Sequence, residues 1–167
     1  MFGNKKRLYV ALYANEVSND DLCRYSWSLL VGPKNESRGS CMGWRYQIRR
    51  SKHGAWRYEA SQCDVRNTPD LLVRVLVAKV TDPDHLAQIC LVVRARDSYP
   101  TCRDWVQDVL AALERDGRTV GKAMLNRDKI YHDAKDYAMN KKNSGRFLDD
   151  ASPKPTFDML QDLETVS

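Results

Sequence analysis

Five short segments in the first half of the chain have the pattern of β-strands, and they constrain the fold more than any other feature. Between Met42 and Ile48 every second residue is apolar, which is the period of a strand with one buried face. The run from Leu71 to Val80 is almost wholly apolar, as in a central strand that is covered on both faces. The patterns predict strands over residues 7–15, 25–31, 42–49, 55–60 and 71–80.

Helical patterns follow these strands. Residues 83–92 predict a short helix that begins at Pro83. Thr101 is a good N-cap with Asp104 three residues on, and Gly117 is a good C-terminal stop, so a second helix begins at Cys102. A third is predicted over 119–141. Strands followed by helices indicate an α+β fold, with an antiparallel sheet of about five strands packed against helices.

The composition changes after residue 142. A chain of 167 residues is long enough for one domain with a real core, which we assign to residues 1–142. Residues 144–155 are rich in Ser, Gly, Asp and Pro, and 157–163 form a short acidic amphipathic piece. We therefore expect residues 143–167 to be a flexible linker and tail.

Charge and cysteine content exclude several classes of protein. The net charge is +5, but the basic residues are spread along the chain without the dense stripe of a nucleic-acid-binding protein. No apolar run approaches the roughly 18 residues of a membrane span. Five cysteines without CxxC spacing disfavour a disulfide framework and a zinc site. We expect a cytoplasmic protein without a metal or cofactor, and the oligomeric state stays open.

Cys102 is the strongest candidate for chemistry. It falls in the first turn of a predicted helix, where unpaired N–H groups and the helix dipole favour a thiolate. The alternative is a small buried hydrophobic residue, since cysteine is often buried. The residues alone leave both open.

Five motifs over roughly residues 7–117 carry a family resemblance. They are RLYVALY (7–13), YSWSLLVGPK (25–34), GWRYQI (43–48), WRYE (56–59) and CRDWV (102–106). These motifs resemble an uncharacterised family of small fungal proteins, which in turn is similar to a circularly permuted papain-like fold (NlpC-type, lecithin–retinol acyltransferase-like). The resemblance implies Cys102 as the nucleophile, Ser26 in the place of the general base and Gln47 in the place of a second histidine.

Both histidine positions are substituted, which changes the expected chemistry. Serine has no useful pKa near 7, and an amide can orient a group but cannot shuttle a proton. The chain has three other histidines, His53, His85 and His132, and the sequence does not say which is near Cys102.

A cleft between the sheet and the Cys102 helix is therefore expected to bind a small, largely apolar molecule. Three hypotheses remain. The first is a cofactor-independent enzyme of a fungal accessory pathway that catalyses a non-covalent cyclisation, isomerisation or pericyclic step. The second is a Cys102-dependent hydrolase or acyltransferase, and the third is a binding module without catalysis. The expected catalytic residues are Cys102, Ser26 and Gln47, and the expected substrate-binding residues are Ser28, Trp27, Tyr13, Tyr9, Arg45 and Trp105.

Overall fold

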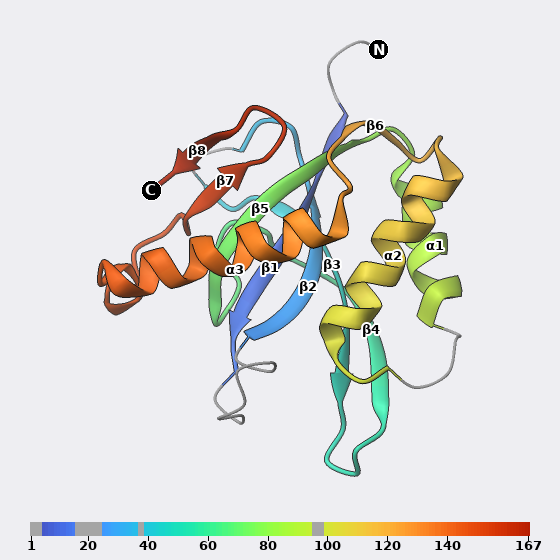
Figure 1. Cartoon of the computed structure of the whole chain (residues 1–167), viewed down its shortest axis with the longest axis horizontal. Helices are drawn as coiled ribbons and strands as arrows, with labels where there is room; N and C mark the ends of the chain where they lie inside the picture. The colour runs from blue at the N-terminus through green and yellow to red at the C-terminus, as the bar shows by residue number, and fades with distance from the viewer. Residues whose placement is uncertain (1–4, 16–24, 37–38, 95–98) are drawn as a thin grey trace.

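The computed structural model describes residues 5–15, 25–36, 39–94 and 99–167. It is an α+β fold in which one mixed sheet carries three α-helices (Figure 1). The strands lie in the order β4-β3-β2-β1-β5-β7-β8, and β6 also pairs with β5. All the pairings are antiparallel except that of β5 with β7.

The five predicted strands are present at nearly the predicted positions. They are β1 (Lys6–Ala14), β2 (Tyr25–Gly32), β3 (Met42–Arg50), β4 (Trp56–Asp64) and β5 (Leu71–Val80). The sheet has eight strands, so the prediction of about five is too low. The additional strands are β6 (Val120–Ala123), β7 (Thr156–Asp158) and β8 (Leu163–Val166).

All three helices pack on one face of the sheet. They are α1 (Pro83–Arg94), α2 (Cys102–Asp116) and α3 (Arg127–Asn143), and a 3-10 turn, η2 (Arg146–Leu148), follows α3. The helix predicted over 119–141 begins later, because the chain first forms β6 against β5 and then caps α3 with Asn126. The predicted stop at Gly117 is confirmed, since this residue has a left-handed φ of 72° and its N–H donates to the Leu113 carbonyl.

The larger core lies between the sheet and the helices. Buried residues of β1, β2 and β5 pack there against Trp105, Val109 and Leu113 of α2 and Ala134 of α3. The opposite face carries a second, smaller cluster around Tyr9, Tyr13 and Leu30. The sheet thus separates two interiors, and the alternation along each strand decides which one a side chain enters.

The C-terminal segment corrects the predicted domain boundary, because the chain after residue 142 ends in two strands of the same sheet, β7 and β8, and not in a flexible tail. The strand β7 lies parallel to β5, with Arg74 opposite Thr156 and Leu76 opposite Asp158. The backbone N–H of Arg74 donates to the Pro155 carbonyl at 3.0 Å, and β8 then pairs with β7. The segment thus provides partners for backbone N–H and C=O groups of β5 that would otherwise be unpaired at the edge of the sheet.

Candidate functional site

The first turn of α2 is fixed by reciprocal capping. The backbone N–H of Asp104 donates to Thr101 Oγ1 at 3.3 Å, and the N–H of Thr101 donates to Asp104 Oδ2 at 3.0 Å. This is the predicted capping box with aspartate in place of glutamate. It holds Cys102 at the first helical position, beside N–H groups that have no partner within the helix.

Cys102 lies against a gap in the sheet. β2 and β3 pair only at Leu29–Tyr46, Leu30–Arg45 and Val31–Trp44, so β2 has no β3 neighbour further toward its start. There the backbone N–H of Trp27 donates to Cys102 Sγ at 3.3 Å. The sulfur therefore takes the place of a strand carbonyl while the residue stays partly exposed. An N–H donor aimed at sulfur stabilises the negative charge of a thiolate.

An aromatic and cationic cluster is connected to this position through Trp27. The Trp27 ring lies 5.7 Å from the ring of Tyr131 on α3, and the Arg103 guanidinium lies 4.5 Å above the same Tyr131 ring. Neither Tyr131 nor Arg103 is among the site residues predicted from the sequence. Tyr131 belongs to the apolar stripe of α3, but only the packing of α3 beside α2 reveals that it meets Trp27.

Trp105, predicted to bind substrate, is instead a core residue of α2. It is fully buried and its ring lies 6.0 Å from that of Tyr58 on β4. Its indole N–H has no hydrogen-bond partner among the described residues. Its position one turn from Cys102 makes it a support for the first turn of the helix.

Ser26, Ser28 and Gln47 are on the opposite face of the sheet from Cys102. Ser28 Oγ donates to Gln47 Oε1 at 2.9 Å, and Gln47 Nε2 donates to Glu59 Oε2 at 3.0 Å. Residues directly opposite in a sheet share a face, and Ser26 and Ser28 stand opposite Tyr13 and Ala11 of the smaller cluster. The prediction that Ser26, Ser28, Gln47 and Cys102 line one cleft is therefore wrong.

The other expected substrate-binding residues divide between the same two faces. Tyr9 and Tyr13 belong to the smaller cluster, and the Arg45 guanidinium lies 5.5 Å from the centre of the Tyr13 ring. Only Trp27 and Trp105 share the helix face with Cys102. Burial raises the pKa of Tyr9 to about 12, so this phenol stays protonated and acts as an ordinary buried side chain.

The three histidines occupy different places. His85 Nε2 lies 3.4 Å from Asp116 Oδ1, at the far end of α2, and the 15 residues of that helix span roughly 20 Å. His53 is exposed in the turn between β3 and β4. His132 is also exposed, with its ring 5.0 Å from that of Tyr131. His132 is thus linked to the Cys102 cluster through Tyr131, and His85 is not.

Two other cysteines, Cys90 and Cys63, differ from Cys102 in their surroundings. Cys90 is fully buried, and burial raises the pKa of its thiol to about 12. Cys63, on β4, is partly exposed like Cys102, but burial also raises the pKa of its thiol. Neither residue is at the start of a helix. Cys63 is therefore a natural comparison for the reactivity of Cys102.

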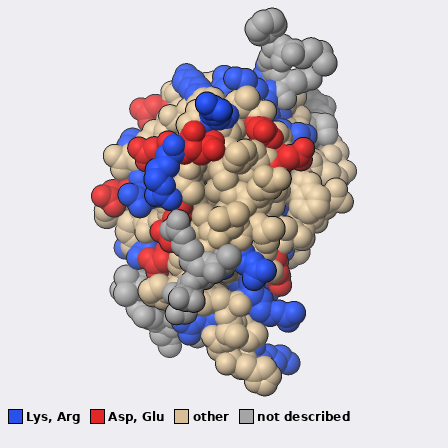
Figure 2. All heavy atoms as spheres, turned by 90° about the vertical axis from the view of Figure 1, so that its right-hand side faces the viewer, with Lys and Arg blue, Asp and Glu red and all other residues tan. Residues whose placement is uncertain are grey.

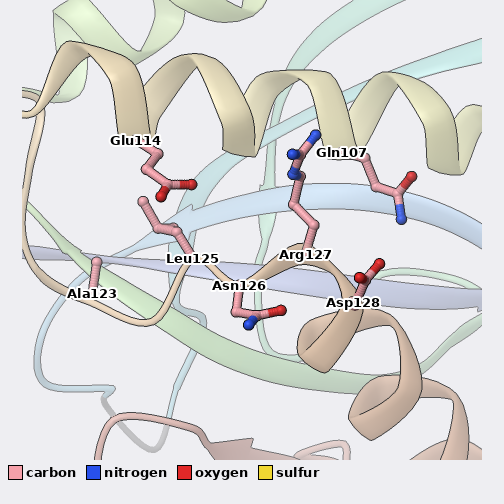
Figure 3. A pocket seen from close by; sticks show the side chains of 7 residues that line it. All are labelled: Gln107, Glu114, Ala123, Leu125, Asn126, Arg127 and Asp128. Carbon is pink, nitrogen blue, oxygen red and sulfur yellow. The ribbon is translucent and has the colours of Figure 1, made fainter.

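A surface cavity of about 660 Å³ lies between α2 and the start of α3 (Figure 3). It was not predicted from the sequence. Gln107 and Glu114 extend into it from α2, and Arg127 points up from the first turn of α3. Gln107 is one turn beyond Arg103, so the cavity lies along the helix that begins at Cys102. Its lining is mostly polar, in contrast to the apolar cleft that was expected.

Comparison with known proteins places the chain in a family without assigning an activity. Residues 5–166 match the sequence pattern described as "Family of unknown function (DUF6914)". The chain belongs to this family. No curated protein and no solved structure matches it. The permuted papain-like relationship therefore stays a prediction for this DUF6914 member.

No helix in the described part of this DUF6914 protein is both long and apolar enough to cross a membrane. Among residues 5–15, 25–36, 39–94 and 99–167, no cluster of three or more His, Cys, Asp or Glu side chains has the arrangement of a metal site.

Proposed function

We propose that this protein acts on a small molecule by acyl transfer through Cys102. The observation that carries the proposal is the position of the sulfur. It lies in the first turn of α2, remains partly exposed and accepts the Trp27 N–H at 3.3 Å. These features favour the thiolate, which is the nucleophilic form of cysteine.

The proposed reaction has two covalent steps. The Cys102 thiolate adds to the carbonyl carbon of an ester or thioester, and the carbonyl π electrons move to oxygen. When the tetrahedral intermediate collapses, the leaving group departs with its bonding electrons and an S-acyl cysteine remains. Water or another nucleophile then attacks the acyl carbon, loses its proton to solvent and releases the thiolate.

The start of α2 also supplies groups that stabilise negative charge. The backbone N–H of Arg103 belongs to the first helical turn and has no partner among the described residues, so it is available to an oxyanion. The Arg103 guanidinium, above Tyr131, is not paired with a carboxylate in the described part of the chain. Because Arg103 directly follows Cys102 in the chain, we expect its positive charge to favour the thiolate further.

The positions of the histidines favour substrates with good leaving groups. His85 is at the far end of α2, and His53 and His132 have exposed side chains. A thiolate or an activated alkoxide departs without prior protonation, whereas an amine does not. We therefore favour thioesters and activated esters over amides.

The non-covalent hypothesis is not favoured, because it depended on a pocket shared by residues that lie apart. It required Ser26, Ser28 and Gln47 to share a pocket with Cys102, and these three side chains lie on the opposite face of the sheet. The cavity between α2 and α3 is not used in this proposal, because its lining on α2 consists of Gln107 and Glu114 and does not include Cys102.

The test compares Cys102 with Cys63 by intact-protein mass spectrometry at neutral pH. The probes are iodoacetamide and a p-nitrophenyl ester, applied to the wild type, Cys102→Ala and the matched variant Cys63→Ala. We expect Cys102 to react about tenfold faster than Cys63 or more, and to form an acyl adduct that turns over. Loss of fast labelling in Cys102→Ala but not in Cys63→Ala supports the proposal. Equal labelling rates at the two cysteines would overturn it.

Two further variants locate the source of the reactivity. Arg103→Gln is expected to slow the labelling of Cys102 several-fold, because it removes the adjacent positive charge. His132→Gln is expected to leave the rate unchanged, because this side chain is exposed and is linked to the cluster only through Tyr131. A large loss in His132→Gln would instead identify His132 as the general base.

A further inference from the structure

The outer edge of β4 is a row of backbone groups, most of which have no partner among the described residues. β4 is the last strand on its side of the sheet and pairs there only with β3. At one end of this pair the Ser51 N–H donates to the Ala55 carbonyl, and at the other the Val65 N–H donates to the Cys41 carbonyl. Because hydrogen-bonded pairs alternate in an antiparallel ladder, residues 57, 59, 61 and 63 bond to β3. The residues that direct their N–H and C=O groups outward are Trp56, Tyr58, Ala60, Gln62 and Asp64, and the Asp64 carbonyl also accepts the Asn67 N–H at 3.3 Å.

This edge carries the charged residues Arg57, Glu59 and Asp64 but lacks the backbone features that protect many edge strands. Natural edges are kept short or are interrupted by proline or by a bulge. β4 is nine residues long, contains no proline or glycine and keeps an unbroken register with β3 from Trp56 to Asp64. The opposite end of the sheet is formed by β8, which has only four residues.

Exposed apolar side chains gather beside this edge. Six large hydrophobic residues are exposed in the described part of the chain, and four of them lie on β3 and α1. α1 packs in the same core as these strands, since its buried Cys90 belongs to the cluster that holds Tyr46 of β3 and contacts Tyr58 of β4. Figure 2, which faces this side of the molecule, shows a broad central area free of Lys, Arg, Asp and Glu. The four exposed residues are Met42, Trp44, Leu91 and Val92.

We propose that β4 pairs antiparallel with β4 of a second copy of this chain, about a two-fold axis at Ala60. Ala60 is exposed, and its outward N–H and C=O meet those of the partner's Ala60. In this register Gln62 stands opposite the partner's Tyr58, and Asp64 stands opposite the partner's Trp56. The pairing makes one continuous sheet through both copies and brings the exposed side chains of β3 close to the partner.

Complementary charges favour a second copy of this chain as the partner that pairs with β4. Arg50 lies across β3–β4 from Trp56, with its guanidinium 4.8 Å from the Trp56 ring. The two-fold register therefore brings Asp64 toward the partner's Arg50, and symmetry makes this contact twice. One Asp64 oxygen already accepts the Arg66 N–H at 3.0 Å, and the other is available. A parallel arrangement of the two strands would bring like charges together at each end.

The other face of the strand brings no like charges together in the same register. Glu59 stands opposite the partner's Ser61, and Arg57 stands opposite the partner's Cys63. The Arg45 guanidinium adds no contact here, because it lies 5.5 Å from the Tyr13 ring on β1, away from β4. The two contacts of Asp64 with the partner's Arg50 therefore favour the dimer over capture of another protein.

The test is analytical ultracentrifugation of the full chain from low micromolar to several hundred micromolar concentration. We expect a reversible monomer–dimer equilibrium in the wild type. Ala60→Pro removes only an outward N–H, so it leaves the β3–β4 ladder intact and abolishes the dimer. Ala60→Lys places two ammonium groups at the axis and weakens the dimer by at least about tenfold. Ala123→Lys, an alanine-to-lysine change at an exposed position on β6, is the matched control and leaves the dimer intact.

Circular dichroism shows whether each variant is folded, and if Ala60→Pro does not fold, Ala60→Lys decides. A wild type that is monomeric over the whole range overturns the proposal. A dimer that survives both Ala60 changes places the interface elsewhere and overturns it too. The inference does not depend on acyl transfer, because the labelling rate of Cys102 is measured separately.

Discussion

The two faces of the sheet have different interiors, although the same strands form both. The helix face is a large apolar core beneath α1, α2 and α3. The opposite face has a small apolar cluster and buries polar side chains, among them Ser28, Gln47 and Arg74. Neighbouring residues on β2 show the contrast, because Trp27 enters the helix core while Ser28 enters the polar network. One residue of register therefore decides whether a side chain can take part in chemistry at Cys102.

Arg74 is the centre of the polar face. Its side chain is fully buried, and its guanidinium pairs with Glu36 at 2.8 Å. It also donates to Thr156 Oγ1 and to the Val65 carbonyl, each at 3.0 Å, and lies 4.3 Å from the centre of the Tyr9 ring. A buried charge is tolerated only with such complete pairing. The helix face has no equivalent among the described residues and is held together by apolar packing.

Removal of residues 153–167 should therefore have the largest effect. The truncation deletes β7 and β8, exposes the edge of β5 and takes Thr156 and the Pro155 carbonyl from Arg74. We expect a loss of about 4 kcal/mol or more in the free energy of unfolding, a large part of the stability of a domain of this size. Urea unfolding followed by tryptophan fluorescence measures this.

A shorter truncation is the control. Removal of residues 163–167 deletes only β8 and should cost much less, because Arg74 keeps all its partners. An unchanged unfolding midpoint in the longer truncation would show that the C-terminal segment is dispensable, as the sequence had indicated.

Arg74→Met should have the next largest effect. Methionine fills much of the same volume but leaves Glu36 without its partner and Thr156 without a donor. We expect a loss of about 3 kcal/mol in the free energy of unfolding. The double variant Arg74→Met with Glu36→Gln should recover part of that loss, because no unpaired charge remains. If the single variant were as stable as the wild type, the polar face would not depend on this ion pair.

The sequence predicted local structure well and long-range pairing poorly. The strands β1 to β5 have a strong apolar or alternating pattern of their own, and the cap of α2 is set by Thr101, Asp104 and Gly117. β6, β7 and β8 are only three or four residues long and have too few positions to show a period. β7 is a strand because β5 offers it an edge about 80 residues earlier in the chain, which is information that no local window contains.

The candidate site shows the same limit. The position of Cys102 was predicted correctly because helix capping is local. The alternation along β2 already separates Ser26 and Ser28 from Trp27, but it does not say which face the helices cover. The resemblance to a hydrolase placed Ser26 and Gln47 beside the cysteine, and packing placed them behind the sheet. Tyr131 and Arg103 meet only because α3 lies beside α2.

Gln47→Leu tests whether the two faces are independent. It breaks the chain of hydrogen bonds from Ser28 through Gln47 to Glu59. We expect a loss of about 1–2 kcal/mol in the free energy of unfolding, since buried Ser28 loses its acceptor. The labelling rate of Cys102 should not change. A reduced rate in this variant, with the fold intact, would mean that the faces are coupled and that Gln47 acts on the cysteine after all.

The smallest effect is expected from replacing Asp116 with Asn. Asp116 is on the helix side of the sheet, at the solvent-facing end of α2. Its carboxylate accepts hydrogen bonds from the Thr119 hydroxyl and from the N–H groups of Thr119 and Arg118. These bonds, that from the Thr119 hydroxyl first, lower the pKa of Asp116 from 3.8 to about 2. A lowered pKa in the folded state means that the ionised carboxylate stabilises the fold above pH 3.8 and that this contribution is lost as the pH falls toward 2. Asp116→Asn should thus be slightly less stable than the wild type at pH 6, and the difference should shrink between pH 4 and pH 2. Urea unfolding of both proteins between pH 6 and pH 2 measures this difference in stability. If the difference did not change with pH, the charge of Asp116 would contribute nothing, and the loss would come from poorer packing or hydrogen bonding of the amide.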